Sequence, residues 1–318
     1  MNRYLLLAVL LILALLAPIG IYPVFLMQAL CFALFASAFN LLIGYVGLLS
    51  FGHAAYFGAA AYVTAHVLKV WHWPTLLGLL AGVAVAAVMG LIFGALAIRR
   101  QGIYFAMITL ALSQMVYFFA LQVKFTGGED GIQAVPRAPL LGRLSIDSDF
   151  TLYYVVLAIF LFGLFVIYRT IHSPFGQVLK AIRENEPRAI SLGYQVDRYK
   201  LVAFILSATL AGLAGSTKVL VVQLASLTDV QWQTSGEVVL MTLVGGLGTV
   251  FGPVAGAFII TTMQYYLSQF EGVGEWVLVI QGIIFVITVL LFRRGIVGEL
   301  AAWWRRRTAQ PVVPAEAD

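Results

Sequence analysis

Polar side chains that could bind a partner are concentrated in one stretch, Thr170 to Lys200, of an otherwise largely apolar chain of 318 residues. Apolar residues recur in its first half at intervals of three and four, the spacing of an amphipathic helix, at Phe175, Val178, Leu179 and Ile182. The polar side of that helix carries Gln177, Lys180, Arg183 and Glu184. This pattern favours a docking element for a soluble partner, and an ordinary solvated or interfacial loop is the alternative interpretation.

A second short helix is predicted after a bend in the same stretch. Glu186 and Pro187 favour a helix start, because proline is tolerated in the first turn, and Gly193 favours its end. The stretch is therefore expected to form a compact knob of two short helices. If a separate soluble subunit supplies energy to this protein, the knob is where that subunit would attach.

Catalytic and metal chemistry find no support in the residue pattern. The histidines are too scattered for metal-ligand spacing, at His53, His66, His72 and His172. The chain lacks a His-Glu-x-x-His motif and a glycine loop ending in Gly-Lys-Ser/Thr, so neither zinc-dependent hydrolysis nor ATP hydrolysis is predicted. A single cysteine, Cys31, excludes an intramolecular disulfide. We expect no catalytic residue, metal or cofactor, and any ATP would be used by a partner.

The composition is that of an integral membrane protein. Hydrophobic residues make up 62% of the chain and charged residues only 10%, and the mean hydropathy is +0.97. The formal net charge of +5 would suggest nucleic acid if the cations shared one face, but they lie between apolar runs. They are therefore interpreted as determinants of membrane topology, and no nucleic acid partner is expected.

Apolar segments near the roughly 20 residues that cross a bilayer as a helix predict an all-α, polytopic bundle of about 10 (8–10) transmembrane helices. The third and eighth segments are rich in glycine and small polar residues, so we expect either of them to be broken or re-entrant. The segments form one transmembrane domain, 1–300, followed by a tail, 301–318, that is predicted to be disordered. They are Tyr4–Ile21, Val24–Ile43, Leu48–Leu68, Thr75–Ile98, Ile103–Val123, Thr151–Tyr168, Leu201–Val222, Glu237–Phe251, Val254–Phe270 and Trp276–Phe292.

The distribution of lysine and arginine predicts that both termini are cytoplasmic. Cations follow the fourth, sixth and tenth segments, whereas the stretches 20–23, 223–233 and 271–275 contain none. The loop 124–150 has three cations against four acids and is expected to be periplasmic. The first segment is interpreted as an uncleaved span, since no small-residue cleavage pattern follows it.

Two glycine clusters allow helices to approach closely, or to break where the backbone lines a cavity. They are Gly44, Gly47, Gly52 and Gly58, and Gly245, Gly248, Gly252 and Gly256. Each follows a span that ends inside, so they are hypothesised to be corresponding elements of a parallel duplication. Helix packing alone is an equally good explanation of the first cluster.

Two charges fall within predicted spans, where an ion costs about 3 kcal/mol or more at the bilayer centre. Lys218 and Glu237 are both near an outer boundary, where snorkelling lowers that cost. We interpret Lys218 as a structural anchor, and Glu237 is as suited to facing a pathway as to a structural role. Asn40, Gln28, Gln114, Gln264 and Gln281 are candidate interhelical hydrogen-bond partners.

Five ordered motifs between about residues 40 and 260 carry a family resemblance. They are Gly47–Gly58, Gly102–Met107, Thr126–Gly131, Ser173–Tyr194 and Ser235–Pro253. Together they resemble the permeases of branched-chain amino acid ABC transporters, more closely the M-type, LivM-like subunit. The chain has Asn185-Glu186-Pro187 where the wider group of ABC permeases has an Ala-Ala pair. This departure is usual for the branch and leaves individual ATPase contacts open.

The resemblance implies a multi-pass, non-catalytic subunit of an importer in the bacterial inner membrane. Its implied partners are a homologous H-type permease, two cytoplasmic ABC ATPases that use the ATP, a periplasmic substrate-binding protein and membrane lipid. The implied substrate is a small amino acid. Leucine, isoleucine and valine suit the apolar walls, and urea, an amide or an aromatic acid stay open.

Three sets of candidate site residues follow from the motifs. The ATPase coupling loop, within 170–200, comprises Phe175, Gly176, Leu179, Ala181, Ile182, Arg183, Glu184, Asn185, Glu186, Pro187, Ala189 and Gly193. The candidates for the translocation path are Ser50, Phe51, Gly52, His53, Tyr56, Glu237, Thr242, Gly245 and Gly248. The candidates for periplasmic contact, within 124–150, are Thr126, Gly127, Gly128, Glu129, Asp130 and Gly131.

An ion-gradient-driven secondary transporter of small organic solutes is the alternative function. It would also be apolar with broken helices, but it normally needs a buried carboxylate near the bilayer midplane, and no convincing one stands out among the acidic residues. A purely structural membrane scaffold is a third hypothesis, and it predicts no transport defect on deletion.

Overall fold

The computed structural model describes residues 3–140, 146–269, 276–291 and 295–299, and in these residues the chain is helical without a named strand. Each of the ten predicted apolar segments overlaps one helix, which confirms the all-α, polytopic fold class. These helices are α1 (Arg3–Gly20), α2 (Pro23–Tyr45), α3 (His53–Lys69), α4 (Thr75–Ala97), α5 (Ile103–Gln122), α6 (Asp149–Ile171), α9 (Val196–Val222), α10 (Trp232–Gly245), α11 (Gly252–Leu267) and α12 (Val277–Leu291).

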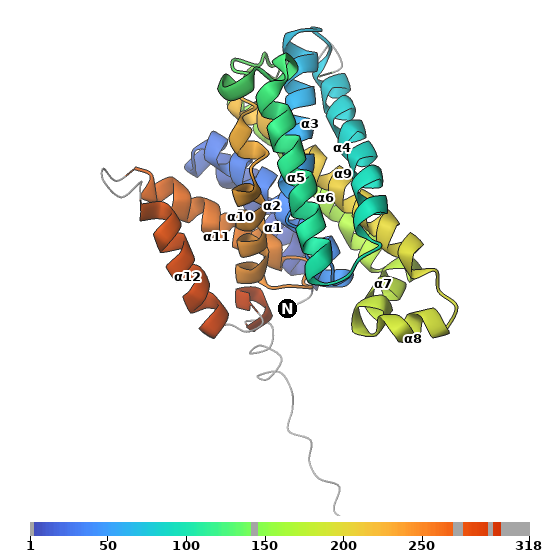
Figure 1. The fold of residues 1–318 in the computed structure, drawn as a ribbon. Coiled ribbons are helices and arrows are strands. Elements are labelled where there is room, and N and C mark those ends of the chain that lie inside the picture. Colours follow the sequence, from blue (N-terminus) through green and yellow to red (C-terminus); the bar gives the residue numbers. More distant parts are fainter. Residues whose placement is uncertain (1–2, 141–145, 270–275, 292–294, 300–318) are drawn as a thin grey trace, which may run out of the picture.

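Shorter elements occupy the two ends of the bundle. The helices α7 (Pro174–Glu184) and α8 (Glu186–Ser191) extend beyond its lower end in Figure 1. The 3-10 turns η1 (Lys124–Thr126) and η2 (Gly128–Asp130) follow α5 at the opposite end, and η3 (Leu227–Asp229) follows α9. The predicted tail, 301–318, lies outside the described residues.

Five helices are long and apolar enough to cross a bilayer: α2, α4, α5, α6 and α9. By contrast, α10 has 14 residues, which at 1.5 Å per residue span about 21 Å of a hydrocarbon core roughly 30 Å thick. Its bounds also differ from the predicted segment, because the helix starts earlier, at Trp232, and residues 246–251 form a turn before α11. Likewise α3 starts only at His53, after a non-helical stretch. The third and eighth segments thus each include non-helical backbone, and α9 also starts earlier than predicted, at Val196.

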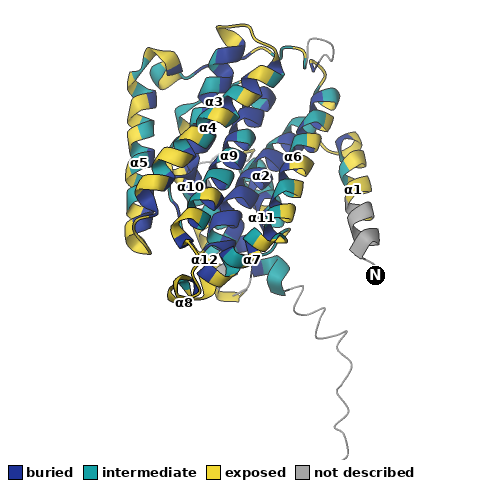
Figure 2. Ribbon diagram, turned by 90° about the vertical axis from the view of Figure 1, so that its right-hand side faces the viewer, coloured by how far each residue is buried: buried dark blue, intermediate teal, exposed yellow. Residues whose placement is uncertain are grey.

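The core of the bundle is formed by α2 and α9, with α3 and α4 packed against α9. Figure 2 shows α2 and α9 largely buried, while α4, α5 and α6 expose one face. Small residues make the close approach possible, since a Cβ at Gly212 would overlap Ala86 of α4 and one at Gly215 would overlap the Phe57 carbonyl of α3. The tightly packed α9 connects the two ends of the bundle, because α8 precedes its first residue and η3 follows its last.

Candidate coupling site

The start of α7 is held firmly to the end of α6. Ser173 precedes α7 and its Oγ accepts a hydrogen bond from the Gly176 amide (3.3 Å) while donating to the Thr170 carbonyl (2.7 Å). Gly176 packs directly on the Thr170 and Ile171 carbonyls, where a Cβ would overlap them. The angle between α6 and α7 is therefore set by contacts that tolerate little change.

The predicted apolar stripe of α7 faces the protein. Leu179 and Ile182 are buried, and the Phe175 ring stacks on Tyr199 of α9 with 5.5 Å between ring centroids. Ile182 also joins a small apolar cluster with Ala189 of α8 and Val196 of α9. This cluster makes α7, α8 and the start of α9 one packed unit, as the amphipathic pattern predicts.

The bend between α7 and α8 is built by Asn185. Its Oδ1 accepts a hydrogen bond from the Arg188 amide (3.0 Å), which caps α8, and Pro187 occupies the first turn. After α8, Gly193 has a φ of +85° and returns the chain toward α9. The two-helix knob predicted from Glu186, Pro187 and Gly193 is therefore confirmed.

Two charged residues at this bend contact the bundle: Glu186 is half-buried, whereas Arg183 keeps an exposed surface. Glu186 Oε1 lies 2.6 Å from Lys200 Nζ of α9 and accepts a hydrogen bond from Gln101 Nε2 (2.8 Å), in the turn between α4 and α5. Lys200 is only 2% exposed. Arg183 Nη1 donates to the carbonyl of Gly44, in the last turn of α2. These contacts link the knob to three different parts of the bundle.

The outward surface of the knob carries both predicted and unpredicted residues. The predicted residues that are exposed are Ala181, Arg183, Glu184, Asn185, Pro187 and Gly193. So are three large apolar or aromatic side chains that the motif did not single out, Ile190 (57%), Leu192 (69%) and Tyr194 (41%). Their signal in the sequence was large apolar side chains within a polar stretch, at positions outside the α7 stripe.

The first group of path candidates lies inside the helix packing at the start of α3. Ser50 Oγ accepts a hydrogen bond from the Gly52 amide (3.2 Å), and the Phe51 amide donates to Thr109 Oγ1 of α5 (3.2 Å). Gly52 approaches the Thr109 carbonyl so closely that a Cβ would not fit. This non-helical stretch therefore wedges α3 against α5.

His53 and Tyr56 continue this packing toward α9. His53 Nε2 lies 2.8 Å from Ser207 Oγ of α9, and the ring is surrounded by Phe39, Tyr56 and Phe204. Tyr56 has no exposed surface. A role of either side chain in translocation stays a prediction.

The second group of path candidates lies on α10 and the turn after it. Glu237 accepts a hydrogen bond from Gln264 Nε2 of α11 (3.3 Å), and the same amide lies 3.4 Å from Gln281 Oε1 of α12. Thr242 Oγ1 donates to the Val238 carbonyl of its own helix (2.8 Å). Gly245 packs on the backbone of Gly252, which draws α10 and α11 together.

The motif from Thr126 to Gly131 forms the tight η1 and η2 turns at the far end of the bundle. Thr126 is buried and its Oγ1 donates to the Ala120 and Val123 carbonyls, while the glycines of the motif adopt positive φ at Gly127 (79°), Gly128 (61°) and Gly131 (66°). Glu129 and Asp130 are exposed. The motif thus presents two carboxylates on a turn that glycine conformations define, and their contact with a partner stays a prediction.

Comparison with known proteins agrees with the resemblance carried by the motifs. Residues 22–289 match the family described as "Branched-chain amino acid transport system / permease component". The chain belongs to this family. Its members are transport permeases, so the chain is a multi-pass membrane transport component rather than an enzyme.

The individual relatives are also named as permeases. The chain is 30% identical over 258 residues to the high-affinity branched-chain amino acid transport system permease protein LivM of Escherichia coli, covering 73% of this chain and 60% of that protein. It is 32% identical over 155 residues to the probable branched-chain amino acid transport permease protein LivH of Methanocaldococcus jannaschii, covering 45% and 46%. The ribose import permease protein RbsC of Bacillus subtilis is 29% identical over 202 residues, covering 58% of each chain. No solved structure matches this chain.

A buried ion pair stabilises the end of this permease that carries η1 and η2. Lys218 Nζ lies 2.8 Å from both carboxylate oxygens of Asp229, and the two residues are 9% and 6% exposed. Asp229 Oδ2 also accepts from the Ser226 amide (3.1 Å). The expectation that Lys218 snorkels to water is wrong, because its charge is neutralised within the protein, although a structural role remains.

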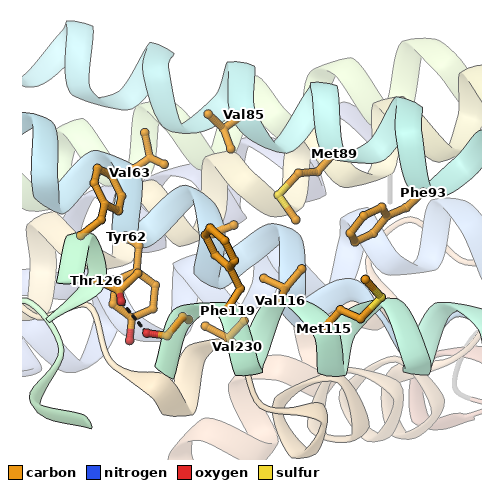
Figure 3. Close-up of a pocket in the computed structure, with 13 residues that line it drawn as sticks. Tyr62, Val63, Val85, Met89, Phe93, Met115, Val116, Phe119, Thr126 and Val230 are labelled. Atoms are coloured by element: carbon orange, nitrogen blue, oxygen red, sulfur yellow. Dashed lines mark hydrogen bonds between the residues drawn. The ribbon is translucent and has the colours of Figure 1, made fainter. Parts of the chain in front are cut away.

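An apolar cavity of about 340 Å³ opens between α3, α4 and α5 of the permease. Figure 3 shows Met89, Phe93 and Met115 lining it, with Tyr62 and Thr126 toward one end. None of the predicted path residues lines this cavity. Among the residues that the structure describes, no group of three His, Cys, Asp or Glu could hold a metal ion.

Proposed function

We propose that this chain is the membrane-spanning subunit of an ABC importer that carries branched-chain amino acids, or related small amino acids and amides, across the bacterial inner membrane. The observation that carries the proposal is the α7–α8 knob, which extends beyond the bundle while it is tied to α2, α9 and the α4–α5 turn. Such a protrusion suits a part that receives mechanical work from another subunit. The family match supports a transport function for the chain.

The proposed orientation places α7, α8 and both termini in the cytoplasm, and the η1–η2 turns in the periplasm. Its support is the charge pattern, since the residues flanking α7 and α8 include Arg169, Arg198 and Lys200, whereas the η1–η2 motif carries Glu129 and Asp130. Under this orientation the exposed carboxylates are available to a periplasmic substrate-binding protein.

The docking surface for a cytoplasmic ATPase would consist of the outward side of the knob. Ile190 and Leu192 supply exposed apolar area there, and Glu184 is an exposed charge of the same knob. Burying one such apolar side chain contributes about 1.5–3 kcal/mol, so two of them are sufficient to make the contact energetically important. ATP would be bound and hydrolysed by two such ATPases, and this chain would need no cofactor.

A second permease is proposed to complete the translocation path. The chain spans about 60% of the length of LivM of Escherichia coli, and it also matches a LivH permease. An H-type partner would supply the other half of the path. Substrate choice would rest largely on the binding protein, because relatives of this chain include permeases named for branched-chain amino acids and for ribose.

Uptake into proteoliposomes tests the proposal. The vesicles contain this chain, its candidate permease, ATPases and binding protein, and radiolabelled leucine is measured with ATP or with a proton or sodium gradient. ATP-dependent leucine uptake that requires the binding protein supports the importer. Uptake that follows an ion gradient and ignores ATP supports the secondary transporter, for which the partly buried Glu237 with its Gln264 contact is the one favourable observation.

A further inference from the structure

Arg183, the last residue but one of α7, is exposed, yet its guanidinium also contacts the bundle. Its Nη1 donates a hydrogen bond to the carbonyl of Gly44 at the end of α2. The carbonyls in the last turn of a helix have no partner within that helix and carry partial negative charge. A guanidinium is well suited to such a position, because it is permanently charged and presents several donors. Arg183 therefore binds the end of α2.

The turn between α10 and α11 meets the same guanidinium. A Cβ at Gly248 would lie 3.2 Å from Arg183 Nη1 and 3.2 Å from the Gly44 carbonyl oxygen. Gly248 has a φ of +72°, so glycine serves both the conformation and the close approach. On the other side, a Cβ at Gly47 would lie 3.3 Å from Arg183 Cγ. Two segments that are distant in the sequence, the end of α2 and the α10–α11 turn, thus converge on one side chain.

Asn40 of α2 locks this turn to α2. Its Nδ2 donates to the Thr249 carbonyl (2.8 Å), and its Oδ1 accepts from the Gly248 amide (3.0 Å). The turn has positive φ at Gly246 (124°) and Gly248 (72°) and separates two short helices. It can therefore move without breaking the hydrogen bonds of a long helix, as hinge segments do.

We propose that Arg183 is a positioning residue for the inner gate of the transport path, and that the gate consists of the end of α2 and the α10–α11 turn. Displacement of α7 by an ATPase pulls both segments through Arg183, and Asn40 keeps them together. The assignment rests on the proposed function and changes the predicted role of Arg183 from an ATPase contact to an internal link. Arg183 lines a polar cavity of about 450 Å³ together with Lys180 and Glu184. This cavity leaves room for the guanidinium to shift.

Glu186, the other charged residue that contacts the bundle, has a different role. Glu186 attaches α8 to Lys200 of α9 and to Gln101, and neither residue belongs to the α10–α11 turn. The knob is therefore fixed to the bundle through Glu186 and to the gate through Arg183. Removing Arg183 should leave the knob folded and able to dock, while the gate no longer follows it.

The test uses the assembled complex in proteoliposomes with Arg183→Ala, Arg183→Lys and Asn40→Ala. Arg169→Ala is the matched control, because Arg169 is an exposed arginine in the last turn of α6 and outside the knob. The measurements are ATPase copurification, ATP hydrolysis, and leucine uptake per ATP hydrolysed. Arg183→Ala should retain the ATPases and hydrolysis but reduce uptake per ATP about tenfold or more, the loss expected from one hydrogen bond to a charged group. Arg183→Lys should recover part of the uptake.

A thiol reporter in the turn separates a transmission role from a merely structural one. Val250→Cys is labelled with a maleimide with and without ATP, and Cys31 contributes little because it is buried. In the otherwise native complex ATP should change the labelling rate, and in the Arg183→Ala background it should not. Two results in Arg183→Ala would overturn the inference: leucine uptake per ATP equal to that of the native complex, or an ATP-dependent change in labelling rate equal to that of the native background. Loss of the ATPases from Arg183→Ala would overturn it as well. Failure of the proposed function itself is recognised separately, since the native complex would then show no ATP-driven uptake.

Discussion

Replacing Lys218 by methionine removes one partner of the buried Lys218–Asp229 pair and leaves the other charge in place. The two side chains are 11% and 8% exposed, and the ammonium contacts both carboxylate oxygens at 2.8 Å. A buried charge that loses its partner costs about 3–5 kcal/mol. Water reaches this carboxylate poorly, so the full range applies rather than the small value of a surface pair.

The expected result is a fall in thermal stability of roughly 6 to 10 °C, taking about 2 °C for each kcal/mol in a large chain. The fraction of monodisperse protein after heating in detergent, followed by size-exclusion chromatography, measures it. Two variants serve as controls. Lys218→Met combined with Asp229→Asn removes both charges and should regain most of the lost stability. Asp149→Asn disrupts the more exposed Arg137–Asp149 pair, whose carboxylate is 41% exposed. This variant should lose about 1 kcal/mol of stability or less.

Equal stability of Lys218→Met and the native chain would refute the reasoning, because it would mean that Asp229 is not held as a buried anion. A double variant as unstable as the single variant would also contradict it. In that case the loss would come from packing around Lys218 rather than from the uncompensated charge.

Three further predictions concern the knob. Leu192→Asp should weaken ATPase binding by about ten- to a hundredfold, since it removes about 1.5–3 kcal/mol of apolar burial; copurification measures this, and Leu192→Met should bind normally. Gly176→Val should displace α7, because a side chain there overlaps the Thr170 and Ile171 carbonyls. Leucine uptake should therefore fall although the chain still inserts into the membrane. A variant with native uptake would show that the α6–α7 angle is not constrained. Glu186→Gln should destabilise the chain by about 3–5 kcal/mol, because Lys200 would be a buried cation without its carboxylate; Lys200→Met in addition should relieve the loss, and a double variant with no recovery would argue against the ion pair.

Hydropathy and helix signals predicted which segments of the chain are helical. The apolar runs need no knowledge of tertiary contacts, and the spacing of Phe175, Leu179 and Ile182 was enough to place the buried side of α7. Local chemistry also predicts the bend, because Pro187 and Gly193 act through their own backbone. The bounds of α10 were mispredicted, since Gln233, Thr234 and Ser235 are polar and yet lie within its first turns.

The sequence does not predict which parts of the bundle Arg183 and Glu186 contact. Arg183 and Gly44 are 139 positions apart, and nothing local distinguishes an arginine that binds a helix end from one that faces a partner. The same holds for Glu186, whose Gln101 contact spans 85 positions. The sequence shows Lys218 as a charge within a span, but Asp229 lies beyond the end of α9, so the spacing does not identify it as the partner of Lys218. Long-range pairing of this kind depends on how α2, α9 and the turns pack together.

Crosslinking from the tip of the knob tests the central claim most directly. A photoreactive amino acid replaces Leu192 in the complete complex in membrane vesicles, and a second variant carries it at Glu129 at the other end of the bundle. We expect the probe at position 192 to crosslink to the ATP-hydrolysing subunits and the probe at position 129 to leave them unlabelled. Crosslinking of the ATPases from position 129 and not from 192, or reaction of position 192 with an impermeant reagent at the external surface of the cell, would contradict the account.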